Sequence, residues 1–166
     1  MRRESDAPTV TSSDAALIAS LASTPYRIAQ MLADVSKDVA RHRPLPEEWC
    51  VVEIVIHLSD VEPRYRTRLK RIVSEDAPQV PAIWPRPMPD LLPLLPEALA
   101  NFRGERAKTV ALLSALAPEA WERPAHHVTL GATTVRKQVQ GLIAHDEDHL
   151  RQVAQTMQMI WKTLNI

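Results

Sequence analysis

Glycine is scarce in this chain, and this scarcity strongly limits the folds that the chain can adopt. The 166 residues include 3 glycines, at positions 104, 131 and 141. Tight β-hairpin turns and phosphate-binding loops need glycine where the backbone takes positive φ angles. An all-β domain and a glycine-rich phosphate loop are therefore excluded, and the sequence favours helices.

Four stretches repeat apolar residues at every third or fourth position, which is typical of amphipathic helices. These stretches are residues 13–41, 50–74, 96–117 and 133–164. Prolines, the strongest helix breakers, separate the stretches. Pro25 lies inside the first stretch. It predicts either a kinked helix or two helices with Thr24 as the cap. Pro63 is expected to bend the second stretch.

The connection between the second and third stretches is unusually rich in proline. Seven of the 14 prolines lie from Pro78 to Pro96, so this part is expected to be an extended crossover. An apolar stripe on each of four helices finds a partner only when all four pack together. The sequence therefore predicts an all-α four-helix bundle with a long proline-rich crossover. We expect residues 1–166 to form one domain, with residues 1–12 as a flexible N-terminal segment.

Charge and cysteine content narrow the function classes. The 20 Lys and Arg residues balance the 20 Asp and Glu residues. This balance argues against binding to nucleic acid or to an anionic membrane mainly through charge attraction. The 1 cysteine excludes an internal disulfide framework and a Cys-cluster metal site, and it fits a reducing compartment. No signal peptide or long apolar run is evident. We expect a cytoplasmic protein with a small-molecule substrate and with no nucleic-acid or membrane partner.

Three histidines have the spacing of a metal site. His145 and His149 lie four residues apart at the edge of the last apolar stripe. Their rings stack on one helix face, so both can reach one ion at roughly 2.0–2.1 Å if it is zinc. His57 lies at the edge of the second stripe, where a neighbouring helix could bring it to the same ion. Three imidazoles leave coordination positions free, as catalytic metal sites do. Each histidine taken alone is more simply explained as a half-buried, hydrogen-bonded side chain.

The other histidines have no partner at helical spacing. His42 is interpreted as a surface residue in a connector, whereas His126 or His127 could border the mouth of the site.

One carboxylate falls near the middle of the last apolar stripe. Asp146 must find a partner there, because a bare buried carboxylate costs several kcal/mol. One possible partner is the second ring N–H of a metal-bound histidine, which would fix the tautomer of that ring. The other is an arginine such as Arg64 or Arg106. The sequence leaves both alternatives open.

Further polar groups surround His57 in the second stretch. Glu53 and Asp60 lie four residues before and three residues after it, so either could carry a proton near a metal-bound water. Helix capping and solvation are the simpler roles for both. The arginine cluster at 64–71 could bind an anionic substrate, but our default interpretation is a solvated face.

Two segments resemble the DinB-like superfamily of four-helix-bundle metalloproteins. Residues 49–60 match a Trp-Ser-x-x-Glu-x-x-x-His-Leu-x-Asp pattern, with Cys50 in the serine position. Residues 145–153 match a His-Asp-x-x-His-x-x-Gln-Ile pattern. The resemblance extends from about Leu17 to Trp161. It implies an up-down-down-up bundle, often homodimeric.

The resemblance also implies a divalent metal held by His57, His145 and His149. The metal is usually nickel or zinc, and iron or manganese in some relatives. Characterised relatives resemble thiol-dependent S-transferases or isomerases, and others are described as metal-dependent hydrolases. Our leading hypothesis is a metal-dependent enzyme that activates a low-molecular-weight thiol for S-transfer to a small electrophile. Two alternatives are a metal-dependent hydrolase of a small molecule and a non-catalytic bundle that binds metal or a partner helix. Thiol transfer is favoured if crossover residues such as Trp84, Arg86 and Met88 line the pocket.

Overall fold

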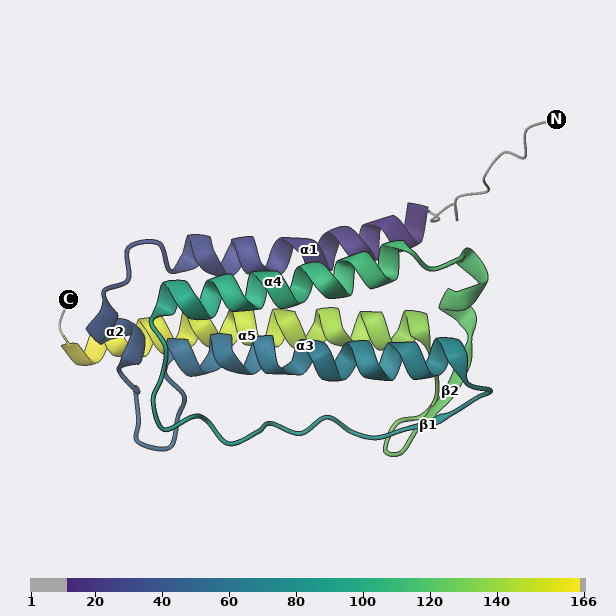
Figure 1. Ribbon diagram of the computed structural model, residues 1–166. Helices are drawn as coiled ribbons and strands as arrows, with labels where there is room; N and C mark the ends of the chain where they lie inside the picture. Colours follow the sequence, from purple (N-terminus) through teal and green to yellow (C-terminus); the bar gives the residue numbers. More distant parts are fainter. Residues whose placement is uncertain (1–11, 165–166) are drawn as a thin grey trace.

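Four long helices form the body of the protein. The computed structural model describes residues 12–164. The long helices are α1 (Ser12–Met31), α3 (Val51–Ser74), α4 (Leu95–Ser114) and α5 (Val135–Leu164). In Figure 1, α1 and α5 run in one direction along the bundle, and α3 and α4 run in the other. This up-down-down-up order confirms the expected all-α four-helix bundle. The expected flexible N-terminal segment lies outside the described residues, apart from its last residue, Ser12.

The long crossover follows from this order of helices. Because α3 and α4 are parallel, the chain must return along the whole bundle between them, as Figure 1 shows. Residues 81–89 of this return are neither helix nor strand, as the prolines predict. Helix α3 packs against α4 and α5, and α1 packs against the same two helices. Helices α1 and α3 therefore occupy opposite corners.

The first helix does not end where its proline suggested. Helix α1 continues through Pro25 to Met31, so the alternative of two helices divided at Thr24 is wrong. The break lies at residues 32–36, and the short helix α2 (Lys37–Arg41) starts after Ser36, whose side chain accepts a hydrogen bond from a backbone amide. Helix α3 likewise continues through Pro63. Each proline removes one hydrogen bond, whereas packing supplies most of the stability of such helices.

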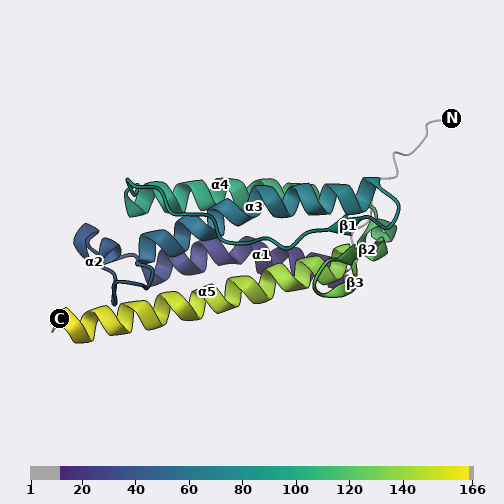
Figure 2. The ribbon, with the colours of Figure 1, turned by 90° about the horizontal axis from the view of Figure 1, so that it is seen from below.

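A small sheet, which the sequence analysis missed, closes one end of the bundle. Its strands are β1 (Gln79–Val80), β2 (Pro124–His127) and β3 (Gly131–Thr134), and the 3-10 helix η1 (Pro118–Glu122) directly precedes β2. Strand β1 is parallel to β2, and β2 is antiparallel to β3. Gly131 has a φ of 77° at the start of β3, a backbone angle that glycine adopts without strain. Figure 2 places the sheet where α3 ends and α5 begins.

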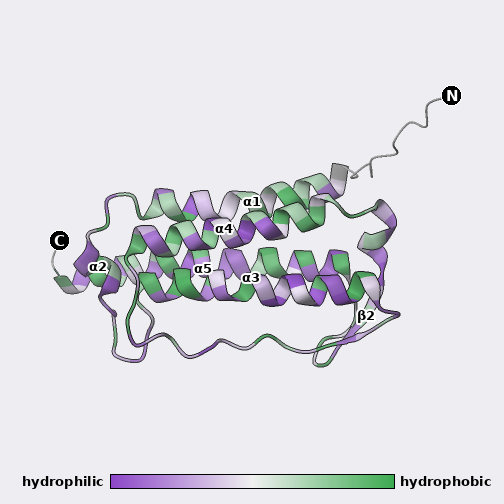
Figure 3. Ribbon diagram, in the orientation of Figure 1, coloured by the Kyte–Doolittle hydropathy of each residue, from purple (hydrophilic) through white to green (hydrophobic). Residues whose placement is uncertain are grey.

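The core consists of two apolar clusters with a polar layer between them. Hydrophobic and hydrophilic residues are interleaved along each long helix, as expected for amphipathic helices (Figure 3). One apolar cluster includes Ile54 and Phe102, and the other includes Leu69 and Leu113. On every long helix, a buried polar residue lies near the point where one cluster gives way to the other. These residues are Thr24, Glu62, Arg106 and Asp146.

None of the helices within residues 12–164 has both the length and the apolar character that crossing a membrane requires.

Candidate metal centre

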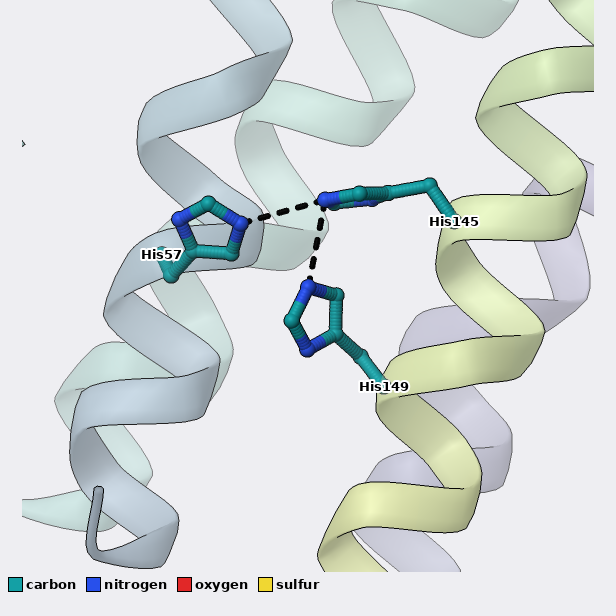
Figure 4. Close-up of side chains that lie close together, drawn as sticks. All are labelled: His57, His145 and His149. Atoms are coloured by element: carbon teal, nitrogen blue, oxygen red, sulfur yellow. Dashed lines mark hydrogen bonds between the residues drawn. The ribbon is translucent and has the colours of Figure 1, made fainter. Parts of the chain in front are cut away.

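Three imidazole rings meet at the middle of the bundle. His57 comes from α3, and His145 and His149 come from successive turns of α5 (Figure 4). The Nε2 atom of His145 lies 3.1 Å from Nε2 of His57 and 3.1 Å from Nε2 of His149. One ring nitrogen of each residue lies within 4.8 Å of the other two. The structure thus brings together the three side chains that the sequence analysis selected, from positions 88 residues apart.

The protonation of these rings suits a metal ligand. Burial, with smaller contributions from the rings of His149 and His145, lowers the pKa of His57 to about 4. Burial is also the main reason that the pKa of His145 falls to about 4, with help from His149 and Arg106. Both rings are therefore neutral near pH 7, and neutral imidazole is the form that binds metal.

The two distances from Nε2 of His145 also fit a divalent cation. A ring nitrogen has one in-plane lone pair or one proton, so Nε2 of His145 cannot form a well-directed hydrogen bond to both neighbours. For an ion at roughly 2.0–2.1 Å, two nitrogens lie about 2.9 Å apart at a right angle and about 3.4 Å apart at the tetrahedral angle. The observed 3.1 Å lies between these values. An all-imidazole donor set suits zinc, nickel and iron better than magnesium or calcium, which prefer oxygen.

Two neighbours fix the orientation of the rings. Nδ1 of His149 and Oε1 of Gln152 lie 2.7 Å apart. An amide oxygen only accepts, so Nδ1 carries the proton and the lone pair of Nε2 faces the other two rings. The Trp49 ring stacks on His149 at 6.5 Å and contacts His57 at 5.0 Å between ring centres. These contacts hold the rings in place from the outer side.

A pocket of about 700 Å³ opens in front of the three histidines, all of which line it. Its walls come from α3, α5, the crossover and the hairpin of β2 and β3. Aromatic residues Trp49, Tyr65 and Trp84 contribute to the lining. This volume lies within the range of small-molecule sites. An ion at the histidines would have protein ligands on one side and space for a small molecule on the other.

Comparison with known proteins identifies the family. The sequence model of the DinB superfamily matches residues 20–153. The chain belongs to the DinB superfamily. The match includes the three histidines and the crossover. No protein with a curated functional description matches the chain significantly.

A solved structure shares the fold of this DinB superfamily member. YfiT from Bacillus subtilis is described as a probable metal-dependent hydrolase with an unusual four-helix bundle topology. The TM-score is 0.73 at 16% sequence identity, and the alignment covers 99% of this chain and 94% of YfiT. At this identity the similarity shows the fold alone.

Asp146 pairs with an arginine rather than with a histidine ring. Of the partners left open by the sequence, Arg106 is the one found, with Nη1 and Nη2 donating to the two carboxylate oxygens at 2.6 and 2.9 Å. Thr24 donates to the same carboxylate at 2.7 Å. Nδ1 of His145 is buried and has no hydrogen-bond partner among residues 12–164. Asp146 therefore does not orient that ring.

The two other acidic candidates are also held by arginines. Glu53 is buried and accepts hydrogen bonds from the Cys50 amide at 2.8 Å and from Arg43 Nε at 3.0 Å. Burial opposes its ionisation, but these bonds outweigh burial and lower its pKa. Asp60 pairs with Arg64 and Arg86. Neither carboxylate lines the pocket in front of the histidines, so helix capping describes Glu53 and ion pairing describes Asp60.

Only some of the residues expected at the pocket mouth line the pocket. His127 lines the pocket, whereas His126 is exposed and does not. Trp84 of the crossover lines it, but Arg86 and Met88 do not. His42 is half-buried in its connector, where we expected a surface residue.

Sequence reasoning missed two residues of this site. The sequence analysis gave Gln152 no role. Gln152 lies three residues after His149, so both side chains lie on one helix face. The sequence analysis also assigned the whole 64–71 arginine cluster to a solvated face. Arg68 is instead 6% exposed and lines the pocket. Its position among the apolar residues Tyr65, Leu69 and Ile72 was the available signal.

Proposed function

We propose that the chain is a metal-dependent enzyme that activates a low-molecular-weight thiol for transfer to a small electrophile. His57, His145 and His149 are the residues that would hold the metal. A divalent cation there would lower the pKa of a thiol or water that it contacts, so that a nucleophile exists near pH 7. The observation that carries the proposal is the convergence of three imidazoles at the wall of a 700 Å³ pocket.

The pocket lining favours a thiol over water as the nucleophile. Among residues 12–164, no Asp or Glu lines this pocket, so a water molecule in the pocket would have no carboxylate of its lining to accept a proton. A thiol needs less help than water, since its ordinary pKa of about 8.5 is far lower. The protein's own thiol, Cys50, is fully buried outside the pocket, so the sulfur must come from a second substrate. In the transfer, sulfur bonds to the electrophilic carbon, the leaving group departs with its bonding pair, and the thiol proton passes to solvent.

Hydrolysis of a small molecule is the second candidate. It is favoured by the structural similarity to YfiT, which is described as a probable metal-dependent hydrolase. This similarity concerns the fold and says nothing about the chemistry of the site.

An activity assay separates these functions. Untagged protein loaded with zinc or nickel would be incubated with a chlorinated aromatic compound or an epoxide, with and without glutathione, mycothiol or bacillithiol. The proposal predicts turnover that requires a thiol and is lost in His57→Ala. Turnover of the same compounds without any thiol would support the hydrolase instead. Protein that binds metal but turns over none of them would support the non-catalytic bundle.

A further inference from the structure

Arg68 is a buried cation without an anionic partner. Its side chain is 6% exposed. Its Nη1 donates to Oε1 of Gln138 at 2.8 Å, and its Nη2 donates to the backbone oxygen of Pro81. Its Nε has no hydrogen-bond partner, and no carboxylate within residues 12–164 forms an ion pair with it. The other deeply buried arginine, Arg106, pairs with two carboxylates.

The neutral contacts of Arg68 compensate its charge only in part. The guanidinium lies 4.9 Å from the centre of the Tyr65 ring, which provides a cation–π contact. Burying an unpaired charge still costs several kcal/mol. A guanidinium has five N–H donors; Gln138 and Pro81 use two of them, and the Tyr65 side chain also interacts with the group. The remaining donors match the oxygens of a carboxylate or phosphate, which arginine binds with two parallel hydrogen bonds.

The surroundings of Arg68 on the pocket side are positive. Lys137 lines the same pocket, is exposed, and has no carboxylate partner among the described residues. No Asp or Glu of residues 12–164 lines that pocket. Arg68 also borders a smaller hollow together with Arg64 and Arg71. Those two arginines are already paired, with Asp60 and Glu75, so the uncompensated charge belongs to Arg68.

We infer that the part of the pocket lined by Arg68 and Lys137 binds an anionic group, a carboxylate or a phosphate, of the molecule that occupies the pocket. The inference rests on the proposed function in one respect, because it takes the histidines as the reacting end. Gln138, the partner of Arg68, precedes His145 by seven residues, which is about 10 Å along a helix. On α3, Arg68 lies 11 residues after His57, which is about 16 Å along that helix. The ligand is thus an elongated small molecule with its acidic group roughly 10–16 Å from the reacting atom.

The test uses metal-free protein, so that it does not depend on the histidines. Chelator-treated protein at pH 7.5 and low salt would be titrated with benzoate, with phenyl phosphate and with uncharged benzamide. Binding would be followed by calorimetry and by tryptophan fluorescence, since Trp49 and Trp84 line the pocket. At least one anion should bind about tenfold or more tightly than benzamide, because a charged hydrogen-bond partner is worth more than a neutral one. The preferred anion identifies the acidic group.

Matched variants locate the binding site. Lys137→Gln should weaken anion binding about fivefold, whereas Lys70→Gln, an exposed lysine on α3 outside the pocket, should leave it unchanged. Arg68→Lys keeps the charge but loses the planar fork, so it should weaken binding as well; its melting temperature checks that it folds. The inference would be overturned if benzoate, phenyl phosphate and benzamide bound with equal affinity. It would also be overturned if Lys137→Gln and a folded Arg68→Lys both kept full affinity for the anion. Such a result in protein that still binds metal through its histidines would leave the proposed function intact.

Discussion

Arg106 and Asp146 form a two-point ion pair at the centre of the bundle, with N···O distances of 2.6 and 2.9 Å. Arg106 also donates to Glu62 of α3 at 2.8 Å and to the backbone oxygen of Leu21 in α1 at 2.8 Å. One side chain of α4 therefore ties together all four long helices. Because Asp146 follows His145 directly, this network also fixes the turn of α5 that carries a candidate metal ligand.

Removing the arginine should destabilise the fold strongly. Arg106→Met would leave Glu62 and Asp146 as buried carboxylates without a cation. Breaking a buried ion pair in this way typically costs about 3–5 kcal/mol of unfolding free energy. Urea unfolding of metal-free protein measures this cost. Arg151→Met serves as the control because the pair of Arg151 with Asp148 is exposed, and its effect should stay within about 0.5 kcal/mol. A loss below about 1 kcal/mol in Arg106→Met would refute the structural role of the network.

Gln152 should set metal affinity without affecting the fold. Gln152→Ala removes the acceptor that orients His149, and the loss of such a contact typically weakens metal binding about 10- to 100-fold. Gln158→Ala, an exposed residue of the same helix, should bind metal as the natural chain does. Competition with a chromophoric chelator measures both affinities. If the two variants bind equally well, the orienting role of Gln152 is wrong.

The single thiol should be inert in the folded protein. Burial raises the pKa of Cys50 to about 11. At pH 8 the thiolate fraction is then about 200-fold smaller than in an unfolded chain, and reaction with Ellman's reagent should slow at least as much. The unfolded thiol ionises first as pH rises, so unfolding free energy should fall between about pH 8.5 and 11. The rate at which urea-unfolded protein reacts with Ellman's reagent is the control. Equal rates in folded and unfolded protein would contradict the burial of Cys50.

The helices were predictable because their signal is local. Apolar spacing located all four long helices, and the density of prolines located the crossover. The break after Met31 was not predictable from Pro25, since packing on α4 and α5 carries the helix through that proline. The small sheet was missed because strand β1 has 2 residues and pairs with a segment more than 40 positions away, so no period-2 pattern could reveal it.

The candidate site was predictable in its ligands but not in its surroundings. The four-residue spacing of His145 and His149 is a property of one helix, so it could be seen in the sequence. The partner of Asp146 could not be chosen, because Arg106 reaches it from another helix. Arg68 was misjudged for a similar reason: its burial depends on Pro81 and Gln138, which come from the crossover and from α5.

The central claim is that three histidines from two helices share one divalent cation. The most direct measurement is the metal content of untagged protein by plasma mass spectrometry, together with its metal affinity by calorimetry. The natural chain would be compared with His57→Ala and His149→Ala. His126→Ala is the control, because His126 is exposed and lies outside the pocket. The account predicts about one ion per chain in the natural protein and the control, and loss of most of that ion in both other variants. The account would be contradicted if the natural protein took up no divalent metal. It would also be contradicted if His57→Ala and His149→Ala retained the metal fully.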